Sequence, residues 1–122
     1  MIYFQHRIHR RDLTRNCNMF YVFGDNDLRA GYGGQAREMR GEPNAIGIRT
    51  KRAPYNTPRS FYLDEDFHEN SHKIRADFAI VKEAMSRGHD VMFPADGIGT
   101  GRAQLSSKYL MFIADCMREI QI

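Results

Sequence analysis

Two apolar runs in this sequence each lead into a glycine-rich stretch, and helix-like sequence follows both stretches. The run MFYVF, residues 19–23, precedes GDNDLRAGYGG, and the run VMFP, residues 91–94, precedes ADGIGTGR. Apolar runs of this length are typical of buried strands, and clustered glycines are typical of loops. The order of strand, loop and helix, found twice, favours an α/β fold with a mainly parallel sheet.

The remaining elements are predicted from apolar spacing and from the positions of glycine and proline. Further short strands are expected at residues 1–5 and 45–49, with a brief edge strand at 60–63. Helices are expected at residues 71–87, 105–120 and, in a shorter form, 34–39, with at most one helical turn at 11–16. Residues 50–59 are predicted to form an irregular loop and residues 64–70 a solvated acidic segment. We therefore expect a single domain, residues 1–122, with a mainly parallel mixed sheet between helices in three layers.

The length, charge and apolar content of the chain limit the kinds of protein that it can be. The chain has 122 residues, enough for one modest core, and its formal net charge is +3. No apolar run approaches the length of a membrane span, and the amino terminus lacks the apolar core of a signal peptide, so we expect a cytoplasmic protein without membrane contact. Cys17 and Cys116 are too few and too far apart for a disulfide framework. The histidines form no metal-ligand pattern, and no metal or cofactor is expected.

Both glycine loops suit a phosphate. Glycines let the backbone approach a ligand closely, and a helix that begins after Gly33 and Gly34 would direct free N–H groups at an anion. In the second loop, Thr100 offers a hydroxyl and Arg102 a bidentate guanidinium. Neither loop matches the Walker A or the dinucleotide-binding pattern. The alternative is that both loops are ordinary tight turns.

Polar residues beside these loops could orient sugar hydroxyls or a water molecule. They are Asp25, Asn26, Gln35 and Asp96. The alternative is structural, because Asp and Asn are common at turns and helix caps. Lys51 is a weaker candidate, as a nucleophile. The ordinary interpretation of a lysine at such a position is an exposed side chain without a catalytic role.

The order of these pieces resembles the macrodomain family, which binds ADP-ribose. Asp12-Leu13-Thr14 is similar to the family's early turn, MFYVFGDN followed by GYGGQAREMRG is similar to its asparagine turn and glycine run, and VMFPADGIGTGRAQL is similar to its late phosphate loop. The resemblance implies that Asp12 holds adenine and that Asn26 lies near the distal ribose. It also implies that Gly33 and Gly34 lie against that ribose or the diphosphate, and that Gly97, Ile98, Gly99, Thr100 and Gly101 surround the diphosphate. Gly31, Gln35 and Arg102 are further candidate ligand-binding residues.

This sequence departs from the macrodomain pattern at three points. Arg11 precedes Asp12 where the family has glycine, the turn reads GDN rather than NAAN, and residues 49–66 have no assigned counterpart. The chain is also short for the fold. These departures bear most on the identity of the ligand.

Three functions stay open from the sequence. The resemblance implies a module that binds ADP-ribose or a related nucleotide or diphosphate-sugar ligand. It also allows a hydrolase of ADP-ribosyl bonds, for which Asn26, Asp25 and Asp96 are the candidate catalytic residues. A small basic nucleic-acid-binding protein is the alternative, based on Arg7, Arg10, Arg11, Arg15 and the many Tyr and Phe side chains. The oligomeric state is not indicated.

Overall fold

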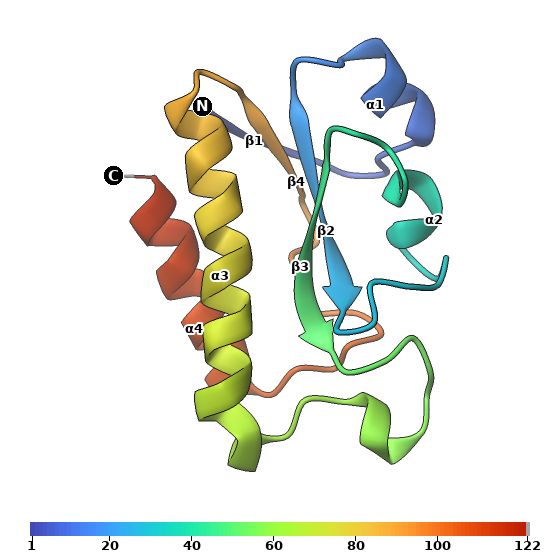
Figure 1. The fold of residues 1–122 in the computed structure, drawn as a ribbon, viewed down its shortest axis with the longest axis vertical. Helices are drawn as coiled ribbons and strands as arrows, with labels where there is room; N and C mark the ends of the chain where they lie inside the picture. Colours follow the sequence, from blue (N-terminus) through green and yellow to red (C-terminus); the bar gives the residue numbers. More distant parts are fainter. Residues whose placement is uncertain (122) are drawn as a thin grey trace.

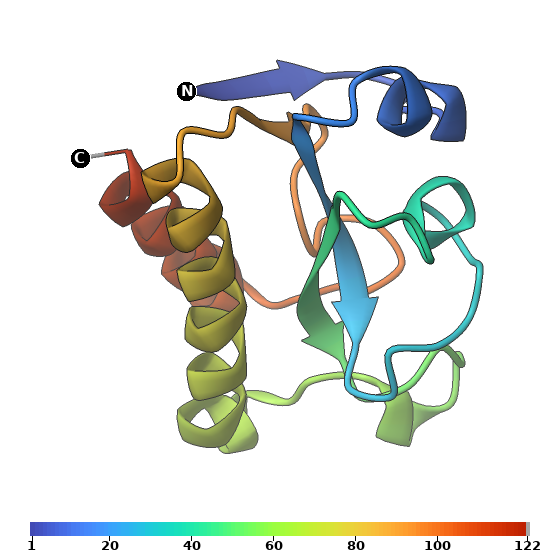
Figure 2. The same ribbon diagram turned by 45° about the horizontal axis from the view of Figure 1, so that its top comes forward.

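Four parallel strands form the central sheet of the computed structural model, which describes residues 1–121 (Figure 1). The strand order is β1 (Ile2–Gln5), β4 (Val91–Pro94), β2 (Phe20–Asn26) and β3 (Ala45–Lys51). Helices α3 (Phe67–Ser86) and α4 (Ser107–Ile120) cover one face, and α1 (Arg10–Arg15) and α2 (Ala36–Met39) lie on the other (Figures 1 and 2). The predicted α/β class with helices on both faces is confirmed, and the sheet is parallel throughout the described residues.

The buried strand β2 divides the interior into two apolar clusters. Val22 packs in the larger cluster with residues of α3 and α4, whereas Tyr21 and Phe23 pack in the smaller cluster with Leu13 and Met39. Successive side chains of a strand point to opposite faces, so an apolar run such as MFYVF serves both layers. This two-sided burial holds the carboxyl end of β2 in place.

The predicted helices at 71–87 and 105–120 are present. Helix α3 begins four residues earlier, at Phe67, and directs Ile74, Phe78 and Val81 into the larger cluster. The segment 64–70 is therefore not simply solvated, because Asn70 is buried and donates a hydrogen bond to the hydroxyl of Tyr109. Within residues 1–121, no helix combines the length and apolar character needed to span a bilayer.

Strands β2 and β3 extend beyond the predicted ends at Phe23 and Arg49. Asp25 pairs with Arg49, and Asn26 pairs with Lys51 across an irregularity in the register. These residues looked like loop residues because they are polar, but the two strands stabilise each other through their parallel ladder. The extension places Asn26 and Lys51 at the carboxyl edge of the sheet.

The predicted edge strand at residues 60–63 is wrong. Phe61 makes only an isolated antiparallel bridge to Lys51. Short 3-10 turns at Pro58–Ser60 and Asp64–Asp66 enclose it and leave no room for a ladder. The segment instead closes over the end of β3.

Candidate functional site

A cavity of about 380 Å³ opens at the carboxyl ends of the sheet strands, between the two glycine loops. Ligands of parallel α/β sheets bind at this end of the strands. All of the predicted site residues line the cavity except Asp12 and Ile98. Those that line it are Asp25, Asn26, Gly31, Gly33, Gly34, Gln35, Asp96, Gly97, Gly99, Thr100, Gly101 and Arg102.

Asp12 and Ile98 do not line the cavity and instead make contacts that stabilise the fold. The Asp12 carboxylate accepts hydrogen bonds from the backbone N–H of His9, at 2.8 Å, and from Nε2 of Gln5, at 3.1 Å, so it caps α1. Ile98 is buried in the larger apolar cluster, although its neighbours on both sides line the cavity. It anchors the second glycine loop against α4.

The two glycine loops approach each other across the cavity. A Cβ atom on Gly33 would lie 2.6 Å from Nη1 of Arg102, so the end of the Arg102 side chain lies against the first loop. Gly97 and Gly99 have φ values of +94° and +83°, which favour glycine and turn the second loop tightly. The backbone N–H groups of residues 99–102 donate to no acceptor among the described residues. Unbonded amides of successive residues in a turn are able to bind an anion.

Lys51 is the feature of this cavity that sequence reasoning misjudged. Its side chain is only 9 % exposed, and its Nζ donates to the carbonyl of Tyr55 at 2.6 Å and lies 4.6 Å from the centre of the Phe61 ring. Burial, and secondarily the charge of Arg102, lower the pKa of Lys51. The signal in the sequence was the alternation of AIGIRTK, which continues the strand through Lys51.

Two cations of the cavity, Lys51 and Arg102, differ from Arg40, which also lines it and pairs with Asp25. Among residues 1–121, no Asp or Glu lies within ion-pair distance of Lys51 or Arg102. Asp96 lines the cavity but is mostly exposed and pairs with His6 at 3.3 Å. A buried charge without a partner is costly, and a bound anion offsets that cost.

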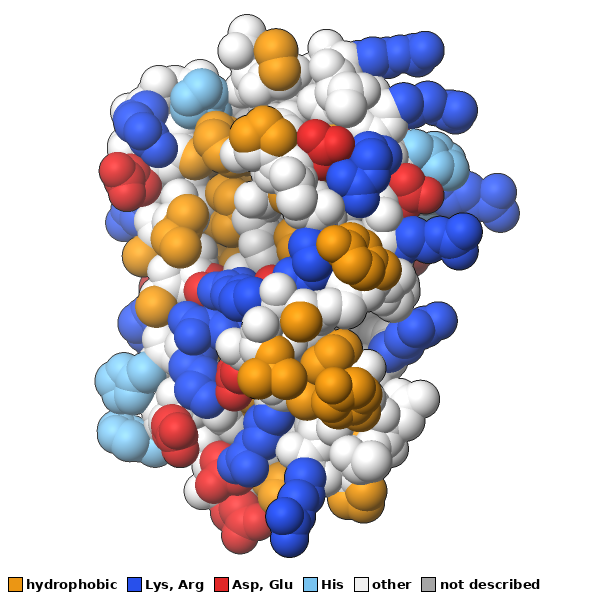
Figure 3. All heavy atoms as spheres, turned by 45° about the vertical axis from the view of Figure 1, so that its right-hand side comes forward, with side chains coloured by type: hydrophobic (Ala, Val, Ile, Leu, Met, Phe, Trp, Pro, Cys, Tyr) orange, Lys and Arg blue, Asp and Glu red, His pale blue; other side chains and the backbone are white. Residues whose placement is uncertain are grey.

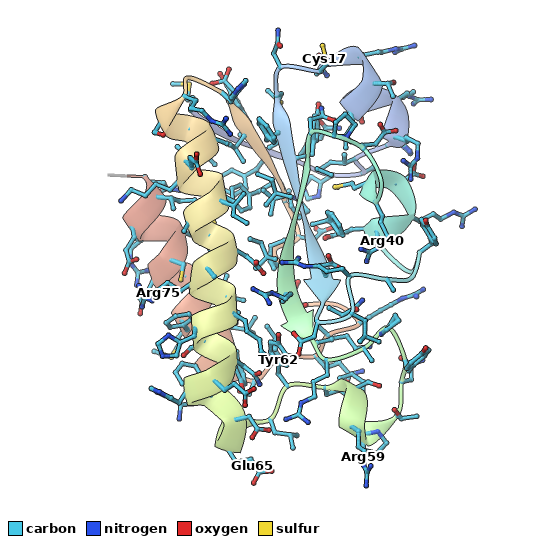
Figure 4. The ribbon with its side chains drawn as sticks, viewed as in Figure 1. Cys17, Arg40, Arg59, Tyr62, Glu65 and Arg75 are labelled. Carbon is cyan, nitrogen blue, oxygen red and sulfur yellow. The ribbon has the colours of Figure 1, made fainter. Side chains whose placement is uncertain are left out.

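Asp25, a predicted catalytic residue, forms ion pairs with two arginines. Its carboxylate is 2 % exposed, with Oδ1 2.5 Å from Nη2 of Arg40 and Oδ2 3.1 Å from Nη1 of Arg29. Arg40 follows α2 and reaches across to β2 (Figure 4). With both oxygens engaged by arginines, Asp25 stabilises the ends of β2 and of the first loop and has no free lone pair directed at substrate.

A second buried carboxylate extends this arrangement to α3. Asp77, 1 % exposed, accepts from Arg29 at 2.7 Å and from Arg49 at 3.0 Å, and also from the Arg49 backbone N–H at 2.8 Å. The Asp77 hydrogen bond raises the pKa of Arg49. We call Asp25, Asp77, Arg29, Arg40 and Arg49 the carboxylate network. It ties the first glycine loop to the sheet and to α3.

Other predicted polar residues are also engaged in holding the loops. Asn26 accepts from the Leu28 N–H and donates to the Ala30 carbonyl, which closes a turn. Gln35 accepts from the Gly24 N–H at 2.9 Å, and the Thr100 hydroxyl donates to the Asp96 carbonyl at 2.7 Å. Helix α2 has four residues, too few for the dipole that the sequence predicted behind the first loop.

One family model matches this chain, over residues 3–109, and is described as a family of unknown function (DUF7831). The match includes both glycine loops, the carboxylate network and Lys51. No curated protein and no solved structure matches the chain. The cavity and its two loops therefore belong to a protein of the DUF7831 family.

Proposed function

We propose that this protein binds ADP-ribose, or a related nucleotide or diphosphate-sugar ligand, in the cavity between the two glycine loops. The observation that carries the proposal is a pair of cations, Lys51 and Arg102, that have no carboxylate partner among residues 1–121 and that line the same cavity as the unbonded amides of residues 99–102. Cations and convergent backbone N–H groups are the two elements that proteins use to bind phosphate.

The size and lining of the cavity support a ligand larger than a single phosphate. About 380 Å³ is within the range of small-molecule sites. The lining includes the phosphate elements and also the polar turn of Asn26, which pairs with Lys51 across β2 and β3. The resemblance to macrodomains favours ADP-ribose among the diphosphates of suitable length.

Binding is better supported than hydrolysis. The Asp25 carboxylate is held by two arginines, and the Asn26 side chain closes its own turn, so neither is free to activate water. Asp96 is the candidate that keeps an exposed carboxylate. A binding function needs no general base. Product analysis after the same titration separates binding from hydrolysis.

The test is isothermal titration with ADP-ribose, AMP and NAD, followed by chromatography of the ADP-ribose sample for products. Gly101→Glu is the informative variant, because a Cβ on Gly101 meets no atom within 4 Å and the residue needs no positive φ. Gly99 is unsuitable, since its φ is +83° and a Cβ there would collide with Leu105. Asn18→Glu, exposed just before β2, adds the same charge away from the cavity.

We expect micromolar binding of ADP-ribose to the wild type and to Asn18→Glu, and loss of binding in Gly101→Glu. The new carboxylate would repel the diphosphate at the mouth of the second loop. Absence of heat with every ligand, from a folded sample, would contradict the proposal. Equal binding by Gly101→Glu would place the ligand elsewhere on the protein.

A further inference from the structure

Two exposed tyrosines adjoin residues that line the cavity, and their rings stack on nothing among residues 1–121. Tyr32 is 66 % exposed and Tyr55 is 60 % exposed. Neither ring stacks on another aromatic ring or on a cation, and neither hydroxyl forms a hydrogen bond, within the described residues. Stacking and hydroxyl hydrogen bonds of these two rings therefore do not contribute to the stability of the described fold.

Both tyrosines are placed at the mouth by the backbone on either side of them. Tyr32 lies between Gly31 and Gly33, which line the cavity, and Tyr55 lies between the lining residues Pro54 and Asn56. The two loops touch, because a Cβ on Gly31 would lie 2.7 Å from Cβ of Pro54. Tyr32 and Tyr55 therefore extend from adjoining loops on the same rim.

Two exposed arginines belong to segments next to this rim. Arg37 follows the lining residue Ala36, and Arg59 belongs to the loop that carries Tyr55. Both are exposed, and neither side chain forms an ion pair or hydrogen bond within residues 1–121. Figure 3 shows Lys and Arg side chains on both sides of a group of hydrophobic side chains on this face of the molecule.

We infer that the cavity receives the phosphate-bearing end of a single-stranded nucleic acid, with bases stacked on Tyr32 and Tyr55 and backbone phosphates near Arg37 and Arg59. The inference rests on the proposed function, because it uses the same anion site for the terminal phosphate. Exposed aromatic rings interleaved with cations are the usual means of binding single strands without sequence preference.

The rim favours a strand over a free nucleotide. A single base can cover one of the two tyrosines, and a single nucleotide brings no phosphate to cations outside the cavity. A strand supplies further bases and one phosphate per nucleotide along its length. Single-stranded DNA and RNA share this chemistry, and the test distinguishes them.

The experiment is fluorescence anisotropy at low salt with labelled eight-nucleotide strands, oligothymidine and oligouridine, each with a 5′-phosphate, a 3′-phosphate or neither. Variants are Tyr32→Ser and Tyr55→Ser, with Tyr3→Ser as the control, since Tyr3 is an exposed tyrosine of β1 that does not line the cavity. ADP-ribose titrations on the same samples report on the cavity itself.

We expect at least one phosphorylated strand to bind, and about tenfold weaker binding when either rim tyrosine is replaced. Tyr3→Ser should bind both the strand and ADP-ribose as the wild type does, and each rim variant should lose more affinity for the strand than for ADP-ribose, because a single base covers at most one tyrosine. Three results would overturn the inference: no strand binds, the terminal phosphate has no effect, or the rim variants bind as the wild type does. ADP-ribose binding in those samples would leave the proposed function standing, and its absence would remove both.

Discussion

The carboxylate network and the cavity both include residues of β2 and β3, but they differ in whether their charged side chains are paired. In the network, Asp25 and Asp77 are almost fully buried and every oxygen of both carboxylates accepts from an arginine. In the cavity, Lys51 is buried without a carboxylate and Arg102 lies against glycine. Charges of the network are paired within the protein, whereas Lys51 and Arg102 have no carboxylate within ion-pair distance among residues 1–121.

The largest effect should come from breaking the network at Asp77. Asp77→Ala leaves Arg29 and Arg49 without their shared carboxylate and the Arg49 N–H without an acceptor. We expect a loss of about 3–5 kcal/mol in the free energy of unfolding, measured by urea denaturation. Glu119→Ala is the control, since its pair with Arg75 is on the surface and should contribute less than about 1 kcal/mol. Equal effects of the two substitutions would contradict the structural role of the network.

Gly47→Ala should have the next largest effect. A Cβ on Gly47 would lie 2.9 Å from Nη1 of Arg29 and closer still to Oδ2 of Asp25, and both groups are held by their ion pairs. We expect a destabilisation of about 1–3 kcal/mol in the same assay. Gly101→Ala, in open space at the cavity, should change stability by less than about 0.5 kcal/mol. A neutral Gly47→Ala would show that the network can shift freely.

A smaller effect is expected at Tyr62, which lies between α3 and the end of β3 (Figure 4). Its hydroxyl donates to Asp27 at 2.6 Å, and Asp27 also pairs with Lys73 at 2.8 Å. Tyr62→Phe should cost about 1 kcal/mol at neutral pH, because Lys73 still satisfies the carboxylate. Burial, and then the Asp27 hydrogen bond, raise the pKa of Tyr62 above its ordinary 10.0.

The pH dependence of Tyr62→Phe sharpens that prediction. Above pH 10.0 the unfolded tyrosine loses its proton while the folded one keeps it, so the wild type loses stability as the pH rises. Tyr62→Phe should lack this part of the alkaline loss. Parallel stability curves for the two proteins above pH 10.0 would contradict the burial of the hydroxyl.

Lys51 should have the smallest effect on the pH dependence of stability, and its sign should be opposite to that of Tyr62. Its folded pKa is lowered below the unfolded value of 10.5, so the unfolded state binds more protons between the two values. Stability should therefore rise with pH through that window, and Lys51→Met should abolish this rise. The affinity for an anion should fall over the same range. Urea titrations and ligand titrations at increasing pH measure the two trends.

Local patterns were sufficient to predict the sheet, its main helices and the position of both glycine loops. The apolar run before Gly24 and the one before Ala95 end at the same edge of a parallel sheet, so their loops meet. The predicted edge strand at 60–63 failed because strand formation depends on a neighbour, and Phe61 finds only the end of β3.

The roles of individual polar residues were harder to predict. Asp25 looked catalytic because it follows a strand beside glycines, but its partners Arg29 and Arg40 come from the loop and from beyond α2. Asp77 was missed, since nothing along α3 indicates that Arg29 and Arg49 converge on it. Contacts between residues far apart in sequence decide whether a carboxylate is paired or free, and local spacing does not carry that information.

The most direct measurement compares Lys51→Met with Lys73→Met for both ADP-ribose binding and the free energy of unfolding. Each substitution removes one lysine charge, but Lys73 is paired with Asp27, whereas Lys51 has no carboxylate within ion-pair distance among residues 1–121. We predict that Lys51→Met loses at least about tenfold in affinity with stability equal to or above the wild type. Lys73→Met should lose stability and keep its affinity. If Lys51→Met binds ADP-ribose as the wild type does, the cavity does not use its unpaired cation for an anion, and the central claim fails.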